Sequence, residues 1–249
     1  MIELSHIQKI FNQGKANEVI ALNNISLTIA EKEFVVIVGS NGSGKTTLLN
    51  IIAGAAIATQ GRIMIDDIDV TNLPEYKRSK WLARVFQNPL RGTAPDLSII
   101  DNFRLAALRT QAKKLTIGVD DKFKKSVKDK IALLGMGLEN KVEQAMGTLS
   151  GGQRQALTLL MSVMDETKIL LLDEPTAALD PKSAAIVLEA ANTLIKEYHL
   201  TAIFITHQLK DAHHYGNRLI QMSEGTIIKD IKEDEKKKIL LNDLFEWFA

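Results

Sequence analysis

Residues 39–46 form a glycine-rich turn with the pattern G-x-x-x-x-G-K-[ST], directly after an apolar run at 34–38. In this setting the pattern indicates a phosphate-binding loop, because its backbone N–H groups can turn inward around an anion and the following helix contributes its positive end. Lys45 would supply a cation for the outer phosphates, and the Thr46 hydroxyl would coordinate Mg²⁺. The residues expected to contact the phosphates are Gly39, Ser40, Asn41, Gly42, Ser43, Gly44, Lys45, Thr46 and Thr47.

A second apolar run, Ile169–Leu172, ends in Asp173 and Glu174. Carboxylates at such a place are unfavourable unless a cation or hydrogen bonds offset their desolvation. Asp173 is placed to hold Mg²⁺, directly or through water, and Glu174 to reach a water beside the outermost phosphate. Taken alone the pair could equally cap the next element, but a phosphate loop in the same chain favours the metal and water roles.

The pentapeptide Leu149-Ser150-Gly151-Gly152-Gln153 is another serine and glycine turn that leads into a helix. A serine hydroxyl, free N–H groups and a helix N-terminus make it a second anion site. The chain thus has two helix starts suited to phosphate, but a single loop of this kind that carries a lysine.

Together, the phosphate loop, the LSGGQ pentapeptide and the strand that ends in Asp-Glu resemble the nucleotide-binding subunit of an ABC transporter. The resemblance runs from about Ile2 to Ile228, essentially the whole chain. It implies an ATP hydrolase with ATP and Mg²⁺ as ligands. In that mechanism Glu174 polarises the attacking water, while Lys45 and His207 stabilise charge on the transferred phosphoryl group.

Four further positions match the family's functional residues. Phe11 lies where the family stacks an aromatic ring on adenine, although a core aromatic is the structural alternative. Gln87 corresponds to a glutamine that reaches Mg²⁺ or the attacking water, and Ala178-Leu179-Asp180 to a loop beside the nucleotide. His207 corresponds to a histidine that contacts the outermost phosphate. The remaining histidines are expected to be structural: His6, His199, His213 and His214.

The resemblance also implies partners. A head-to-tail homodimer would place Ser150, Gly152 and Gln153 of one copy over the nucleotide held by Lys45 of the other. Integral membrane permease subunits would contact residues 88–98, and a solute-binding protein is a further expected partner. We expect a peripheral protein on the cytoplasmic face of the membrane. The sequence of residues 89–95 is similar to the corresponding segment in ATPases of amino-acid uptake systems.

The helix after the pentapeptide departs from the family pattern. Relatives usually read R-Q-R and then an Ala-Arg pair, whereas this chain has Arg154-Gln155-Ala156 and then Met161-Ser162. Two arginines are therefore missing, although the phosphate-facing residues are intact. We expect the change to concern interface salt bridges rather than catalysis.

The elements that must position these residues alternate between strands and helices. Apolar runs predict strands at 26–29, 34–38, 62–65, 84–86, 169–172 and 202–205, and periodicity predicts helices at 47–53 and 153–164. Asp180-Pro181 predicts a helix start, followed by one apolar face at Ile186, Ala190, Leu194 and Tyr198. This order predicts an α/β fold: a P-loop NTPase core with a mostly parallel sheet and helices on both faces. The resemblance adds an N-terminal antiparallel β part and an inserted α-helical subdomain.

We expect a single ABC ATPase domain over 1–249. Its core with the β part would cover 1–87 and 165–230. A helical subdomain at 88–164 would carry the LSGGQ turn, with Asp120 or Asp121 as the cap of one of its helices. A helical tail at 231–249 ends in an apolar cluster that would dock on the core or contact a partner: Leu240, Leu241, Leu244, Phe245, Trp247 and Phe248.

Composition narrows the function classes. The 31 Lys and Arg residues nearly balance the 30 Asp and Glu residues, which argues against a protein that holds nucleic acid through bulk charge. The absence of cysteine excludes disulfides, thiolate catalysis and Cys-ligated metal sites. No apolar stretch approaches the roughly 18 residues of a membrane span.

Three rival functions remain open from the sequence. An exporter or a lipoprotein-releasing system would use an ATPase with every motif named above. A soluble ABC ATPase that remodels DNA or ribosomes is less compatible, because such proteins insert long coiled coils or carry two cassettes. A P-loop kinase of small molecules would leave LSGGQ without a role.

Overall fold

The structure is a computed structural model that describes residues 1–109 and 118–247. Its central six-stranded sheet contains, in spatial order, β10 (Thr226–Ile231), β9 (Arg218–Ser223), β3 (Phe34–Val38), β8 (Thr201–Ile205), β7 (Ile169–Asp173) and β6 (Leu82–Val85). Neighbouring strands are parallel except β10 and β9. The carboxyl ends of β3, β8 and β7 therefore meet at one edge, where ligands of α/β sheets bind.

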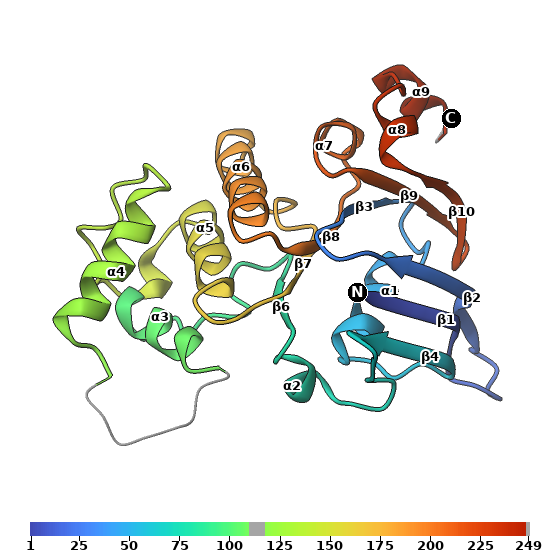
Figure 1. Cartoon of the computed structure of the whole chain (residues 1–249), viewed down its shortest axis with the longest axis horizontal. Helices are drawn as coiled ribbons and strands as arrows, with labels where there is room; N and C mark the ends of the chain where they lie inside the picture. The colour runs from blue at the N-terminus through green and yellow to red at the C-terminus, as the bar shows by residue number, and fades with distance from the viewer. Residues whose placement is uncertain (110–117, 248–249) are drawn as a thin grey trace.

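A four-stranded antiparallel sheet lies beside the first helix of the chain (Figure 1). Its strands, in spatial order, are β2 (Val19–Ile29), β1 (Ile2–Phe11), β4 (Gln60–Ile65) and β5 (Ile68–Asp69). A mostly parallel sheet, an antiparallel N-terminal sheet and a separate group of helices confirm the predicted fold class.

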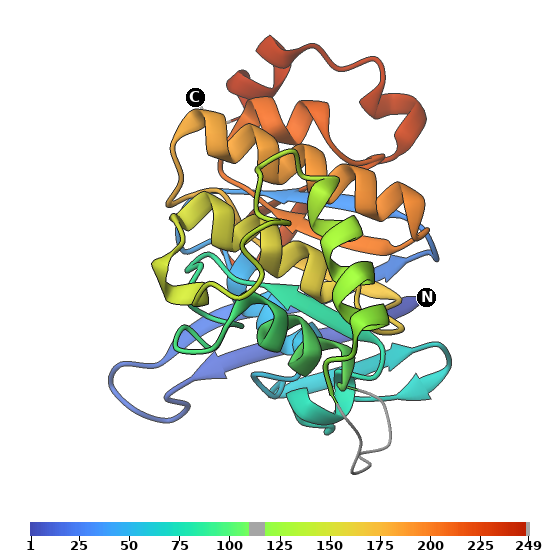
Figure 2. The ribbon, with the colours of Figure 1, turned by 90° about the vertical axis from the view of Figure 1, so that its left-hand side faces the viewer.

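The helices lie on both faces of the central sheet and at its ends (Figure 1). They are α1 (Lys45–Ala53), α2 (Glu75–Arg78), α3 (Ile99–Ala107), α4 (Asp121–Ala132), α5 (Gly151–Ser162), α6 (Pro181–Glu197), α7 (Leu209–His214), α8 (Glu233–Lys236) and α9 (Leu241–Glu246), with a 3₁₀ turn at Met146–Thr148. Figure 2 shows α4, α5 and α6 stacked next to one another. None of the described helices is long and apolar enough to cross a membrane.

Two hydrophobic cores bury both faces of the central sheet. In β3, Val36 and Val38 face the core that contains α5 and α6, whereas Val35 and Ile37 face the core that contains α1 and the antiparallel sheet. Alternate residues of a strand point to opposite faces, so a strand covered on both sides is apolar throughout. This explains why residues 34–38 read as a continuous apolar run.

Aspartate side chains at the N-cap position set the starts of α6 and α4. The Asp180 carboxylate accepts hydrogen bonds from the N–H groups of Lys182 and Ser183, which confirms it as the cap of α6. Asp120 accepts from the N–H of Phe123, so Asp120 rather than Asp121 caps α4. In both cases the carboxylate satisfies first-turn donors that have no partner within the helix.

The predicted apolar face of α6 is wrong except at Leu194. The buried side chains of this helix are Val187, Leu188, Ala191, Leu194 and Ile195. Ile186 and Ala190 instead line a hollow between α4 and α6, together with Leu133, which is 73% exposed. The prediction followed steps of four, whereas a helix of 3.6 residues per turn needs steps of three and four alternately.

The C-terminal tail docks on the core. Leu244 is fully buried in the core that contains α6, and Leu241 and Trp247 pack against the same core. Leu240 and Phe245 point outward and are 68% and 49% exposed. The docking prediction is therefore confirmed for Leu241, Leu244 and Trp247. Phe248 lies outside the described residues.

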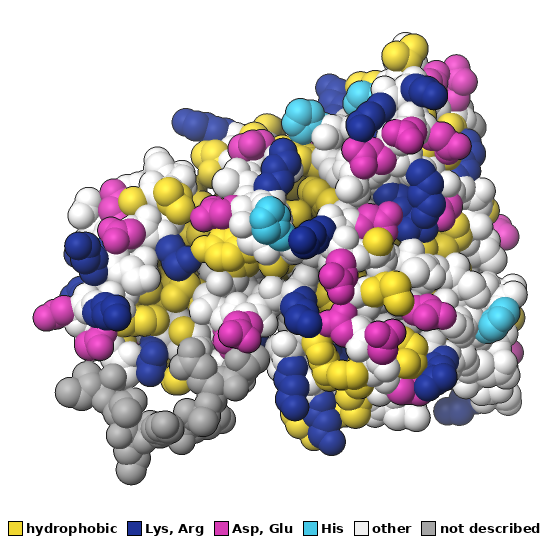
Figure 3. Space-filling model, in the orientation of Figure 1, with side chains coloured by type: hydrophobic (Ala, Val, Ile, Leu, Met, Phe, Trp, Pro, Cys, Tyr) yellow, Lys and Arg dark blue, Asp and Glu magenta, His cyan; other side chains and the backbone are white. Residues whose placement is uncertain are grey.

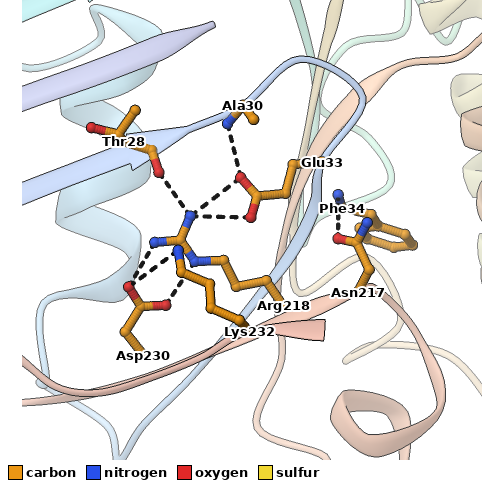
Figure 4. A network of polar contacts seen from close by, with 8 residues as sticks. All are labelled: Thr28, Ala30, Glu33, Phe34, Asn217, Arg218, Asp230 and Lys232. Carbon is orange, nitrogen blue, oxygen red and sulfur yellow. Dashed lines mark hydrogen bonds and ion pairs between the residues drawn. The ribbon is translucent and has the colours of Figure 1, made fainter. Parts of the chain in front are cut away.

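Arg218, whose side chain is buried, joins the two sheets through an ionic network (Figure 4). Its guanidinium in β9 donates two hydrogen bonds to the Asp230 carboxylate in β10, at 2.7 and 2.6 Å. The same group contacts the Glu33 carboxylate at 3.1 Å and donates to the carbonyl oxygen of Thr28 in β2 at 2.7 Å. A buried guanidinium needs such partners, because removing one leaves an uncompensated charge.

On the face in Figure 3, basic and acidic side chains are interspersed.

Candidate active site

The phosphate loop connects β3 to α1 and packs against β2. Gly44 has φ of +98°, and a Cβ at this position would lie 2.6 Å from the carbonyl oxygen of Ala21. Only glycine satisfies both the left-handed conformation and the close approach. Among the described residues no side chain caps the start of α1, and its first turn contains no acidic residue. The first N–H groups of the helix therefore receive no side-chain cap, which leaves them available to an anion.

Lys45 lies across the phosphate loop. Its ammonium Nζ donates to the carbonyl oxygens of Gly39 at 2.8 Å and Ser40 at 2.9 Å, and the residue is 6% exposed. Burial lowers the pKa of Lys45, and the nearby charges of Glu174 and Asp173 oppose that shift. Its ammonium group also lies 3.5 Å from the hydroxyl of Ser43, so the hydrogen-bond partners of Lys45 in the described residues are neutral oxygens of the loop.

Asp173 ends β7 and contacts the start of α1. Its Oδ1 accepts a hydrogen bond from the Thr46 hydroxyl at 3.3 Å. Its Oδ2 accepts from Nη2 of Arg84, in β6, at 2.6 Å. The second terminal nitrogen of Arg84 donates to the side chain of Asn50, in α1, at 2.7 Å. The carboxylate of Asp173 is therefore paired on both oxygens and lies between two elements of the site.

Glu174 follows Asp173 in an unusual backbone conformation. Its φ is 46°, in the left-handed region that non-glycine residues seldom adopt. Its N–H donates to the carbonyl oxygen of Ile205 at 3.1 Å, and its Oε2 lies 3.2 Å from Nδ1 of His207. Strained residues of this kind cluster at functional sites, where the surrounding structure holds them.

The LSGGQ turn begins α5 with a capping box. The hydroxyl of Ser150 accepts from the N–H of Gln153, and the Gln153 side chain accepts from the N–H of Ser150. A Cβ at Gly152 would lie 2.5 Å from the side chain of Ser183, so the turn packs closely on α6. The buried side chain of Gln155 donates to the carbonyl oxygen of Phe86 at 2.8 Å and so ties α5 to the residue before Gln87.

The structure brings together five of the predicted residues: Lys45, Thr46, Asp173, Glu174 and His207. They lie at or after the carboxyl ends of β3, β8 and β7, which are consecutive in the sheet in that order. Within residues 1–109 and 118–247, no hydrogen bond or ion pair joins them to the LSGGQ turn, which lies on the helical side of the fold.

The other predicted residues lie around this group. Gln87 is exposed just after β6, and Asp180 caps α6. Phe11 ends β1 with 41% of its surface exposed, and the Lys9 ammonium lies 5.0 Å from the centre of its ring. The alternative of a core aromatic is therefore wrong for Phe11, whose ring is partly exposed.

Arg84 is the contact residue that the sequence prediction missed. The signal was present, because a charged residue in the strand predicted at 84–86 must find a partner when that strand is buried. The second missed arginine is Arg78, a fully buried side chain that binds the carboxyl end of α1.

Comparison with known proteins decides the family. Residues 22–177 match the domain described as ABC transporter. The chain belongs to the ABC transporter family. It is 37% identical, over all of its length and 98% of the relative, to the tyrosine transport ATP-binding protein of Clostridioides difficile. This ABC transporter subunit therefore binds and hydrolyses ATP as the motor of transport.

More distant ABC transporter relatives cover most of the chain. The spermidine/putrescine import protein PotA of Bacteroides thetaiotaomicron is 34% identical over 91% of the chain and 45% of the relative. The macrolide export protein MacB of Campylobacter fetus is 32% identical over 99% of the chain and 37% of the relative. The dimeric structure of the ATP-binding cassette MJ0796 bound to ADP and Pi superposes with a TM-score of 0.79, at 28% identity, over 94% of this chain and 99% of that one.

Proposed function

We propose that this subunit energises amino-acid import from the cytoplasmic face of the membrane. The tyrosine transport protein, similar over the full length, supports the solute class. The sequence of residues 89–95 supports the same solute class. Import is supported by the similarity to PotA, while the similarity to MacB keeps export as the second candidate.

The arrangement of Lys45, Glu174 and His207 supports a direct attack of water on the outermost phosphate of ATP. Glu174 would orient the water and accept its proton. A bond would form between the water oxygen and the γ-phosphorus, and the bond from that phosphorus to the oxygen bridging the β-phosphate would break, leaving ADP and phosphate. Lys45 and His207 would stabilise the charge that develops on the phosphoryl oxygens. The 3.2 Å contact between Glu174 and His207 carries this proposal.

Thr46 and Asp173 would hold Mg²⁺ beside the phosphates. A hydroxyl and a carboxylate 3.3 Å apart are the hard oxygen ligands that this ion prefers, so the residues fit the ion. Gln87 would approach the same ion from the segment after β6. When bound, Mg²⁺ would neutralise charge on the phosphate oxygens and orient them.

A head-to-tail homodimer would complete the active site. The LSGGQ turn offers a serine hydroxyl and the N–H groups of Gly151 and Gly152, which lie outside the capping box. Within the described residues the turn makes no bond to the phosphate loop of its own chain. Ser150, Gly152 and Gln153 of a second copy would supply that anion site. Phe11 would stack on the adenine ring of ATP. Asp180 would line the interface between the two copies. The dimeric form of the MJ0796 cassette supports this arrangement.

Integral membrane permease subunits would dock beside Gln87, with a solute-binding protein on the far side of the membrane. The segment after Gln87 exposes large apolar side chains, with Leu90 at 51% and Leu97 at 41%, which is typical of a surface that a partner covers. A helical subdomain at 88–164, joined to a core at 1–87 and 165–230, would transmit movement between the permease and ATP.

The E174Q variant tests the catalytic proposal. We expect it to bind ATP, to lose hydrolysis and to elute from size exclusion as a dimer in ATP and Mg²⁺. The contrasting result is an E174Q protein that hydrolyses ATP at the wild-type rate. For the solute, cells that lack this gene are complemented with wild type or K45A, and uptake of labelled tyrosine is measured. Restored uptake with wild type alone supports import, whereas restored efflux supports the second candidate.

A further inference from the structure

A buried ion pair lies where the proposed Mg²⁺ site is formed. The side chains of Arg84 and Asp173 are each 8% exposed, and Nη2 of Arg84 lies 2.6 Å from Oδ2 of Asp173. Arg84 lies in β6, which pairs in parallel with β7, and their registers place Arg84 opposite Leu171. A long side chain can therefore extend along the neighbouring strand to the carboxylate at its end.

The guanidinium also links the two elements that carry the proposed metal ligands. Its other terminal nitrogen binds the side chain of Asn50 in α1, the helix that begins with Lys45 and Thr46. The ring of Phe86 lies 4.8 Å from the guanidinium carbon and shields the group on that side. Arg84 thus bridges α1 and β7, the two elements that carry Thr46 and Asp173.

The two oxygens of Asp173 are divided between different partners. Oδ1 accepts a hydrogen bond from the hydroxyl of Thr46, the other proposed Mg²⁺ ligand. Oδ2 accepts a hydrogen bond from the guanidinium of Arg84. A metal ion at Oδ1 would share one carboxylate with a guanidinium. Two cations on one buried carboxylate repel each other, and each weakens the attraction that the other receives.

We propose that Arg84 is a positioning residue that neutralises Asp173 before the metal binds and then competes with Mg²⁺ for the same carboxylate. The proposal rests on the Mg²⁺ site proposed above. Arg84 fixes the carboxylate with Oδ1 turned toward Thr46, so the ligand geometry is preformed. The same charge lowers the affinity for Mg²⁺, which favours release of the ion with ADP after each turnover.

The R84M variant tests this competition by thermal unfolding. The melting temperature is measured at a fixed ADP concentration while Mg²⁺ is titrated from an EDTA-treated sample, and the half-maximal Mg²⁺ concentration is read from the rise. R62M is the matched control, because Arg62 is 62% exposed and pairs with Asp69 away from the site. The readout is metal dependence rather than activity, so a loss of folding stability alone does not mimic the effect.

R84M should melt below wild type without Mg²⁺, by about 10 °C, because Asp173 loses its cation. Its half-maximal Mg²⁺ concentration should fall about tenfold or more, and Mg²⁺ should recover much of the lost stability. R62M should match wild type in both quantities. An R84M protein that melts lower by the same amount at every Mg²⁺ concentration, with an unchanged half-maximal value, would overturn the proposal.

A double variant covers the case in which R84M does not fold. R84M/D173N removes both charges, so it should fold and melt above R84M in EDTA. A double variant no more stable than R84M would refute the role of Arg84 as counter-ion. If wild type itself shows no effect of Mg²⁺ on ADP binding, the proposed metal site and the inference both fail. A normal wild-type titration with an unchanged R84M titration rejects the inference alone.

Discussion

Nδ1 of His207 lies 3.2 Å from Oε2 of Glu174, which joins the residues that follow β8 and β7. The two side chains differ in exposure, at 52% for His207 and 17% for Glu174. Glu174 is held with a positive φ by its bond to Ile205, so its carboxylate has a fixed place while the histidine can adjust. Groups held in fixed positions beside a reacting phosphate are what electrostatic catalysis needs.

Replacing His207 by alanine should lower the rate of ATP hydrolysis about 100-fold or more, because one group that stabilises transition-state charge is lost. ATP binding should persist, since Lys45 and the loop N–H groups are unchanged. Steady-state kinetics with a nucleotide-binding assay separates the two effects. H213A is the control, because His213 contacts the carbonyl oxygen of Ile239 in the tail. Equal loss in both variants would argue against a direct role for His207.

Arg78 should be important for stability. Its buried guanidinium donates to the carbonyl oxygens of Ile51 and Ile52 in the last turn of α1, and burial lowers the pKa of Arg78 to about 10. R78M removes the donor to the Ile52 carbonyl and leaves the Ile51 carbonyl with the N–H of Gly54 alone. We expect the free energy of unfolding to fall by about 2–4 kcal/mol. Urea unfolding measures it, with R62M expected within about 0.5 kcal/mol of wild type. If the free energy of unfolding of R78M also lies within about 0.5 kcal/mol of wild type, α1 does not need the hydrogen bonds from Arg78.

The ionic network in Figure 4 should make stability depend on acid pH. The hydrogen bonds from Arg218 hold the pKa of Asp230 below its usual 3.8. A depressed carboxyl pKa gives stability that is present above pH 3.8 and is lost as the pH falls through the lower value of the folded state. D230N should therefore be less stable than wild type near neutral pH, with a difference that shrinks in acid. Urea midpoints over that range test this, and a constant difference would contradict it.

Local sequence signals were sufficient for the elements that hold the site. The continuous apolar runs at 34–38 and 169–172 are strands because both of their faces are buried, and Asp180-Pro181 starts α6 as its capping chemistry requires. The residue pattern did not predict strands β1, β5, β9 and β10 or helices α2 and α7. β10 has no fully buried residue and α7 has six residues, so neither shows a long periodic pattern.

Relationships between distant residues could not be predicted in the same way. Arg84 was recognisable as an unusual charge, but its bond to Asp173 depends on the pairing of β6 with β7. The buried face of α6 depends on α5 and the sheet together, and the sequence periodicity alone selected a neighbouring stripe. Tertiary packing, rather than local preference, determined these features.

A mixture of two inactive variants tests the composite active site most directly. K45A lacks the phosphate cation and S150R blocks the LSGGQ turn, so each should be inactive as a homodimer. In a mixed dimer, the phosphate loop of the S150R chain meets the intact LSGGQ turn of the K45A chain, and one complete site results. We predict that the mixture regains ATP hydrolysis that neither variant shows alone. A mixture that hydrolyses no more ATP than its two components measured separately would contradict a site shared between two copies.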